Sequence, residues 1–199
     1  MWTVGWPGYL LFNVASQEYS RRANHFDPNS PMFDEKDRPY IYLGNLGIFL
    51  SLCLFAAVSH FYGFTFFLKY YGIPYLWVNF WLVTITYLQH TDPKIPHYRG
   101  EEWTFIRGGL ATIDRDFGIL NIFHHHIADS HVAHHLFSTM PHYNAIQATP
   151  YLKKFLGKYY LEENENVFVS LWKNWNFCQW VDPTGNVVWW KNSKTVKQQ

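Results

Sequence analysis

The sequence predicts an all-α integral membrane protein with a cytosolic helical cap and a short C-terminal β-hairpin. Of its 199 residues, 48% are hydrophobic and 21% aromatic, whereas only 16% are charged. The apolar residues are concentrated, because no Asp, Glu, Lys or Arg occurs from Ile41 to Leu68 or from Tyr70 to Thr91. Charge-free runs of this length are typical of helices that cross a bilayer. Two such helices are therefore expected.

The composition excludes several other classes of protein. So high an apolar content is incompatible with disorder over most of the chain. Two cysteines, Cys53 and Cys178, are too few for a disulfide framework. A net charge of +1 argues against a nucleic-acid partner. Seven of the eleven histidines lie between His124 and His142, so the chemistry is expected in that region.

Residues 1–40 are predicted to be the end of a truncated transmembrane helix followed by a cytosolic loop. The segment Val4–Val14 is apolar but only about half a span long. No basic segment precedes it and no small-residue cleavage site follows, so it does not have the pattern of a signal peptide. The polar, proline-containing residues 15–40 then lead into the first complete span.

Residues 41–91 are predicted to form a transmembrane helical hairpin. From Ile41 to Tyr62, 16 of 22 residues are hydrophobic, and a helix of that length covers about 33 Å, enough for the bilayer core. The second run is rich in Trp and Tyr, which favour membrane interfaces. A short link from Gly63 to Lys69 joins the two. The alternative, two buried helices of a soluble core, is disfavoured by the length of the charge-free runs.

The basic residues predict the orientation of this hairpin. Four Lys or Arg precede the first run and eleven follow the second, whereas the link contains only Lys69. Positively charged segments remain on the cytosolic side of membranes. The polar segments before the first run and after the second run are therefore both expected in the cytosol.

Residues 92–165 are predicted to be a cytosolic histidine-rich region, and residues 166–199 a cytosolic C-terminal tail. Helices are expected near Tyr151–Tyr160 and over residues 166–180. The second of these has four apolar residues at helical spacing on one face: Phe168, Leu171, Trp172 and Trp175. Beyond it, the β-type runs CQWV and VVWW flank Asp182–Asn186 and predict the hairpin.

The segment Asn121–His135 (NIFHHHIADSHVAHH) has the pattern of a metal site. On a helix, His131, His134 and His135 stand at i, i+3 and i+4, which places three imidazoles on one face. Neutral imidazole suits iron, copper, nickel or zinc. The alternative is a solvated or nucleic-acid-facing cluster of histidines.

Further histidines extend the candidate site. If the helix continued backward, His124 would lie two turns before His131 on the same face, and one of His124, His125 and His126 is expected to join the site. His90 ends the second apolar run, where an ionisable group suggests a function; the alternative is an interfacial ring among lipid headgroups. The predicted topology places His90 on the same side as the HVAHH segment.

Nearby charged residues are candidates for supporting roles. Asp129, two residues before His131, could hydrogen-bond a ligand imidazole and fix its tautomer; it could equally be a plain surface residue. Asp114, Arg115 and Asp116 are either structural ion pairs or a support for the metal ligands.

Three long segments resemble the membrane fatty acid desaturases, in particular the oleate Δ12 and ω3 desaturases of fungi and plants. They are Leu88–Tyr98 (LQHTDPKIPHY), Arg107–Asn121 (RGGLATIDRDFGILN) and Ile127–Ala145 (IADSHVAHHLFSTMPHYNA). Two N-terminal stretches, Gly5–Val14 and His25–Phe33, also resemble that group. The likeness covers nearly the whole chain and weakens after about residue 160.

The resemblance implies a set of metal ligands, because three histidine boxes in that family hold a non-haem di-iron centre. HVAHH matches the third box, His90 matches an extra histidine at the end of the preceding helix, and His125 matches the histidine six residues before the third box. The implied metal ligands are His90, His125, His131, His134 and His135. No catalytic residue beyond these ligands is implied. Asp129 and His142 are expected to shape the site, whereas His124 and His126 are additional in this chain.

The chain departs from the family pattern in two ways. The family segment QHTHP reads Gln89-His90-Thr91-Asp92-Pro93, a change that affects no expected ligand. The first two boxes, HxxxH and HxxHH, have no match before His90, because His25 and His60 are isolated. The sequence is therefore expected to be the C-terminal half of a desaturase, and to be inactive alone.

The resemblance further implies O2-dependent introduction of a cis double bond into an acyl chain such as oleate, carried on a glycerolipid or on CoA. The protein would fix the acyl chain against the metals and exclude water. Electrons would come from NADH through cytochrome b5 at the cytosolic face of the endoplasmic reticulum membrane. This is a step in polyunsaturated fatty acid biosynthesis.

Other functions are compatible with the same motifs. Hydroxylases, epoxygenases, acetylenases and conjugases are related to the desaturases and differ by few substitutions. A non-catalytic membrane protein that binds a metal through its histidines is a different class. A soluble histidine-rich metal store is a third, which the two charge-free runs disfavour.

Overall fold

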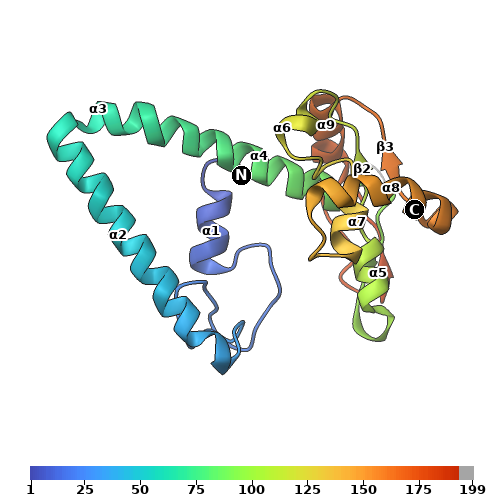
Figure 1. Ribbon diagram of the computed structural model, residues 1–199. Helices are drawn as coiled ribbons and strands as arrows, with labels where there is room; N and C mark the ends of the chain where they lie inside the picture. Colours follow the sequence, from blue (N-terminus) through green and yellow to red (C-terminus); the bar gives the residue numbers. More distant parts are fainter. Residues whose placement is uncertain (193–199) are drawn as a thin grey trace. The chain divides into compact units, whose positions relative to one another are not determined.

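The computed structural model describes residues 1–192, which are mostly helical, with strands of only two residues each (Figure 1). The chain divides into two compact units, Met1–Thr84 and the part from Ile85 onward, and each is described by itself. The end of the predicted tail, residues 193–199, lies outside the described residues.

The first unit begins with a short apolar helix and a loop. Helix α1 (Gly5–Phe12) lies inside the predicted apolar segment, and Asn13 ends it in a left-handed conformation. The following loop is tied to the next helix, because the side-chain amide of Asn45 donates to the backbone oxygen of Phe26 at 2.7 Å. The predicted polar connection is therefore an ordered loop.

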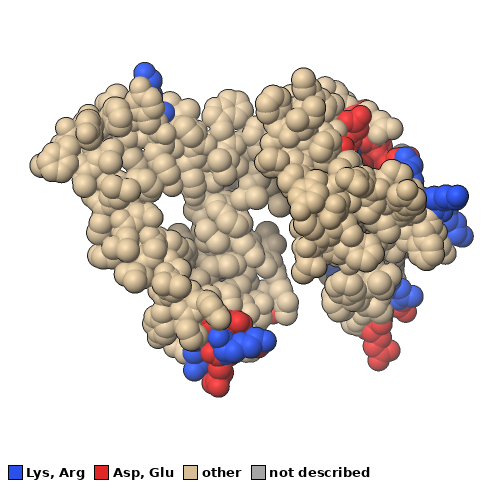
Figure 2. Space-filling view, viewed as in Figure 1, with Lys and Arg blue, Asp and Glu red and all other residues tan. Residues whose placement is uncertain are grey.

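Helix α2 (Arg38–Tyr62) is the long apolar helix that the sequence predicts, and it begins three residues before the predicted start at Ile41. Its start is set by a 3-10 turn, Glu35–Asp37, with a reciprocal capping box between Asp34 and Asp37. At 1.5 Å per residue it is about 37 Å long. Its apolar side chains are uncovered, and charges gather at its N-terminal end (Figure 2). Within residues 1–192, only Glu35–Tyr62 is long and apolar enough to cross a membrane.

The second helical run is longer than predicted. Only Gly63 (φ 86°, ψ 150°) interrupts the helix, a conformation that favours glycine. The chain then continues through α3 (Phe64–Phe67), a π-helical turn (Leu68–Gly72) and α4 (Ile73–His90). The predicted short link Gly63–Lys69 thus contains a break at Gly63, and its remaining residues are helical. Near the turn, the ring of Phe55 lies 5.3 Å from Phe67.

The second unit holds short helices around two small strand pairs. Its helices are α5 (Phe105–Leu110), α6 (Leu120–Phe123), α7 (His131–Leu136), α8 (His142–Leu156) and α9 (Val167–Phe177). Strand β1 (His97–Tyr98) pairs antiparallel with β4 (Val187–Val188), and β2 (Asp114–Arg115) pairs parallel with β3 (Glu162–Glu163). The core contains Leu88, Ile95, Ile113, Ala128, Val132 and Ala133.

The C-terminal hairpin differs from the prediction. The CQWV run forms only a single bridge, in which Trp180 pairs with Lys191, the residue after the VVWW run. The VVWW run pairs instead with β1, where Val187 lies opposite Tyr98. Arg99 supports this arrangement, because its backbone N–H donates to the oxygen of Asn186 at 2.8 Å. Long-range pairing therefore overrides the local hairpin pattern.

The helices near the C-terminus also differ in detail. Helix α8 begins nine residues before the predicted start, and Pro150 lies inside it. Helix α9 lies within the predicted range, but Trp172 and Trp175 of its apolar face are exposed. The buried face contains Leu171 and Asn174, whose side-chain amide donates to the backbone oxygen of Thr91 at 2.6 Å. The hydrogen bond of Asn174 thus stabilises an orientation in which a polar residue is buried and two tryptophans are exposed.

Candidate metal centre

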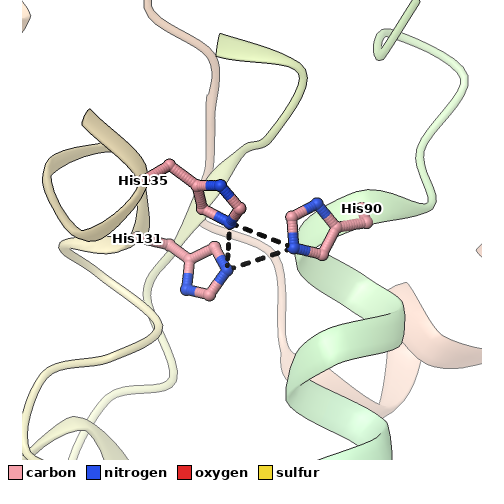
Figure 3. Close-up of side chains that lie close together, drawn as sticks. All are labelled: His90, His131 and His135. Carbon is pink, nitrogen blue, oxygen red and sulfur yellow. Dashed lines mark hydrogen bonds between the residues drawn. The ribbon is translucent and has the colours of Figure 1, made fainter. Parts of the chain in front are cut away.

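Three histidines from two helices of the second unit meet at one point (Figure 3). His90 is the last residue of α4, whereas His131 and His135 lie one turn apart on α7. Their Nε2 atoms are 3.3 Å apart between His90 and His131, 3.2 Å between His90 and His135, and 3.2 Å between His131 and His135. Two helices separated by some forty residues of sequence therefore present three nitrogens to the same space.

The spacing of these nitrogens suits a transition metal. Imidazole nitrogens bind a metal such as zinc at about 2.0–2.1 Å, so neighbouring ligand nitrogens lie about 2.9–3.4 Å apart in octahedral or tetrahedral geometry. All three distances in the cluster fall in that range. Neutral imidazole is a ligand of iron, copper, nickel and zinc, so the donor set fits the iron that the family resemblance implies.

Backbone contacts orient two of the three rings. Nδ1 of His131 lies 2.9 Å from the oxygen of Ile127, to which it donates in the neutral ring. The Nε2 lone pair of His131 then points into the cluster. The ring of His90 is hydrogen-bonded to the backbone of Ala111. Such contacts commonly fix the tautomer of a metal-ligating histidine.

Burial keeps the cluster uncharged. His131 is only 5% exposed. Its pKa lies well below the ordinary 6.5, because burial and the neighbouring rings of His90 and His135 disfavour the imidazolium form. Burial, together with the neighbouring rings of His90 and His134, lowers the pKa of His135 to about 4. Unprotonated imidazole is the form that binds metal, so the site is ready for an ion at neutral pH.

The lowered pKa values predict a pH dependence of stability in the protein stripped of metal by a chelator. Between about pH 6.5 and pH 4, His135 binds more protons in the unfolded state than in the folded state, so its contribution to the free energy of unfolding falls with acidification. Urea unfolding across this range, compared between the wild type and His135→Gln, should show a shallower decline in the variant. The raised pKa of Asp114 acts in the opposite direction, but Asp114 is present in both proteins. Its contribution therefore cancels in the comparison, which isolates that of His135. Equal slopes in the two proteins would contradict the prediction.

The other predicted ligands lie outside this cluster. His134 is exposed, and its ring centroid is 5.4 Å from that of His131. His125 is also exposed and lies 4.9 Å, centroid to centroid, from His142. The structure therefore brings together three of the five predicted ligands and leaves His125 and His134 on the surface.

The predicted helix before the third box is interrupted. His125 and His126 have φ values of 53° and 60°, which are left-handed, so α6 ends at Phe123 and α7 starts only at His131. The expectation that His124 shares a helical face with His131 is therefore wrong. Asp129 contacts His126, at 2.9 Å from Nδ1, rather than one of the three clustered rings.

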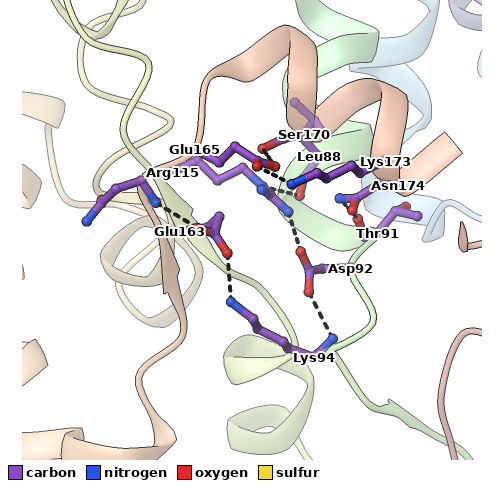
Figure 4. A network of polar contacts seen from close by, with 11 residues as sticks. Leu88, Thr91, Asp92, Lys94, Arg115, Glu163, Glu165, Ser170, Lys173 and Asn174 are labelled. Atoms are coloured by element: carbon purple, nitrogen blue, oxygen red, sulfur yellow. Dashed lines mark hydrogen bonds and ion pairs between the residues drawn. The ribbon is translucent and has the colours of Figure 1, made fainter. Parts of the chain in front are cut away.

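A buried ion pair beside the cluster is the feature that sequence reasoning missed. Nη2 of Arg115 lies 2.6 Å from Oδ2 of Asp92, and their side chains are only 2% and 6% exposed (Figure 4). Beside them, Lys94 and Glu163 form a more exposed pair at 2.7 Å. The signal available in the sequence was Asp92 itself, an acidic residue directly after an uncharged run, where the resembling family has histidine. Of the three charged residues at 114–116, Arg115 is thus part of an ion pair.

The three clustered imidazoles at the end of an apolar helix could hold a metal ion. The family model for fatty acid desaturases matches residues 1–166, and the chain belongs to that family.

Curated relatives agree with this membership. The chain is 44% identical over 194 residues to an oleoyl-12-hydroxylase of Ricinus communis, which covers 95% of this chain and 50% of the relative. It is 44% identical over 195 residues to an omega-6 fatty acid desaturase, endoplasmic reticulum isozyme 1, of Glycine max, covering 96% and 50%. A Delta(12) fatty acid desaturase of Mortierella isabellina is 46% identical over 188 residues, covering 94% and 47%. The chain spans about half the length of the curated relatives it matches.

Proposed function

We propose that this chain carries one metal site of an O2-dependent desaturase that introduces a cis double bond into an acyl chain such as oleate. The observation that carries the proposal is the meeting of His90, His131 and His135 at distances that suit a metal. The names of the Glycine max and Mortierella isabellina relatives support the reaction and the position of the new bond. The product belongs to polyunsaturated fatty acid biosynthesis.

The clustered histidines hold one iron of a non-haem di-iron centre in this proposal. The centre, when bound, supplies O2 activation and the oxidising power to remove hydrogen from the acyl chain. The residues of this chain bind the iron, keep its ligands unprotonated and exclude water through the burial of His131. The exposed rings of His125 and His134 serve as ligands with groups outside the cluster, and Asp129 and His142 shape their surroundings.

The proposal places the enzyme in the endoplasmic reticulum membrane with its histidines facing the cytosol. Helix α2 crosses the bilayer, supported by its length and uncovered apolar side chains. The run from α3 to α4 is the second arm of a hairpin, supported by the ring contact between Phe55 and Phe67. The single basic residue at the turn, Lys69, supports the orientation. Electrons arrive from NADH through cytochrome b5, and the acyl substrate is part of a glycerolipid or of CoA.

A hydroxylase is the second candidate, favoured by the 44% identity to the Ricinus communis relative. Both reactions begin by removing hydrogen from the same kind of unactivated methylene. They differ in whether a second hydrogen is lost or a hydroxyl group is added, so the products distinguish them.

The decisive experiment measures the products formed from labelled oleate. The chain is fused to the part of the Glycine max relative that it does not match, and expressed in cells that make oleate but no dienoic fatty acid. Dienoic product is expected from the fusion and not from His135→Ala, whose iron ligand is missing. The chain alone is the matched control and is expected to give none.

Two outcomes would count against the proposal. Hydroxylated oleate without diene would favour the hydroxylase. An expressed, membrane-bound fusion with full iron content and no modified oleate would refute both candidates, and would leave a metal-binding protein without oxygen chemistry.

A further inference from the structure

We propose that Asp114 and Arg115, neighbours on β2, are positioning residues that hold α7 and α4 at the separation at which their imidazoles meet. The inference rests on the proposed metal site and adds to it the residues that set its geometry. The side chain of Asp114 contacts the beginning of α7, where His131 lies, and that of Arg115 contacts the end of α4, where His90 lies.

Asp114 holds the beginning of α7. Its Oδ1 accepts the backbone N–H of Val132, the residue after the ligand His131, at 2.8 Å. The first N–H groups of a helix have no partner within the helix and favour a negative group. Ser130, at the usual capping position, gives no side-chain cap, because its hydroxyl instead donates to the oxygen of His126. A carboxylate from another element therefore takes the place of the local cap.

The carboxylate of Asp114 is itself fixed. The hydroxyl of Tyr160 donates to its Oδ2, so both oxygens are engaged. Asp114 is 5% exposed. The contacts leave it little freedom to move without displacing the first turn of α7.

Arg115 holds the end of α4. Its Nε donates to the backbone oxygen of Leu88 at 3.0 Å, and its Nη2 lies 2.6 Å from Oδ2 of Asp92 (Figure 4). Leu88 and Asp92 stand two residues before and two residues after His90. One guanidinium therefore contacts the chain on both sides of this proposed metal ligand. The last carbonyl groups of a helix lack partners within the helix, and Arg115 satisfies one of them. The planar guanidinium can make both contacts at once, which an ammonium group cannot.

Strand β2 makes these two supports part of one element. Successive side chains of a strand point to opposite sides, so two neighbours can reach two helices. The backbone of β2 is fixed by Asp114 N–H to the oxygen of Leu161 at 3.0 Å and by Arg115 N–H to the oxygen of Ala128 at 2.9 Å. A shift of either side chain therefore changes the separation between His90 and His131.

The test is anaerobic titration of the full chain in detergent with cobalt(II), read from the visible spectrum of imidazole-bound cobalt. Asp114→Asn keeps an acceptor oxygen at the same position and loses the charge. Asp114→Glu keeps the charge and moves the carboxylate by one methylene. Residues that orient metal ligands typically contribute about 10–100-fold to metal affinity. We expect near-native affinity and spectrum for Asp114→Asn, and at least about a tenfold loss with an altered spectrum for Asp114→Glu.

Arg115→Lys tests the second support in the same way. It keeps a positive charge beside Asp92 but cannot contact Leu88 and Asp92 together, so a similar loss of affinity is expected. Lys94→Gln is the matched control, because it removes a neighbouring polar contact and leaves the contacts to Val132 and Leu88 in place. It should bind cobalt as the wild type does. Circular dichroism and gel filtration establish that each variant is folded; if Asp114→Glu is not, the shorter Asp114→Ser replaces it.

The outcomes separate this inference from the proposed function. Wild-type chain that binds no cobalt would overturn the metal site and the inference with it. Cobalt binding that is native in all three positioning variants would overturn the inference alone. A loss of affinity in Asp114→Asn with near-native affinity in Asp114→Glu would also overturn it, because the charge and not the position would then matter.

Discussion

Replacing His131 with alanine is expected to lower the affinity of the chain for cobalt(II) by at least about 100-fold, because removal of an outer contact to a ligand alone costs about 10–100-fold. His131 lies within 3.3 Å of both other clustered nitrogens and is the most deeply buried of the three. The measurement is the same cobalt titration. In the fusion enzyme the variant should make no dienoic product.

Two alanine variants serve as controls for His131→Ala. His97→Ala removes a half-buried ring that packs against Trp190 and has no contact with the cluster, so cobalt affinity should be unchanged. His134→Ala removes the exposed ring on the same helix and should change the affinity of the chain little, although the family pattern predicts loss of diene formation in the fusion. Near-native cobalt affinity in His131→Ala would remove it from the ligand set.

Replacing Asp92 with alanine is expected to destabilise the protein by about 3–5 kcal/mol, because it leaves the guanidinium of Arg115 buried without its partner. For a chain of this size that corresponds to a fall of roughly 10 °C in Tm. Thermal unfolding followed by circular dichroism in detergent measures the change.

The neighbouring pair provides the control for Asp92→Ala. Lys94→Ala breaks the more exposed contact to Glu163 and should cost at most about 1 kcal/mol. The double variant Asp92→Leu/Arg115→Met removes both buried charges and should regain most of the stability, but not the metal affinity. Equal Tm values for Asp92→Ala and Lys94→Ala would contradict the expectation.

The sequence predicts most of the candidate site, because its signals are local. The spacing of His131 and His135 places both rings on one helical face, and the position of His90 at the end of an apolar run predicts the second contributor. The break before His131 was not predictable, since left-handed backbone at His125 and His126 is uncommon for residues other than glycine.

What sequence reasoning could not supply are contacts between distant residues. The pairing of Asp92 with Arg115 joins positions 23 residues apart, and no periodicity encodes it. The same holds for the tail, where β4 pairs with β1 rather than closing a local hairpin. The membrane-spanning pattern of α2, by contrast, depends only on composition and length, and the helix extends over nearly the predicted residues.

The pairing of His97 with Val188 has a consequence for synthesis on the ribosome. The partner of β1 is translated 91 residues after it (188 minus 97), which takes about 5–20 seconds at typical elongation rates. Asn174, which holds the backbone just after His90, is also late to emerge. The nascent polypeptide thus exposes His90 well before the segments that secure it are synthesised, so metal loading is expected only after Asn174 and Val188 have been added.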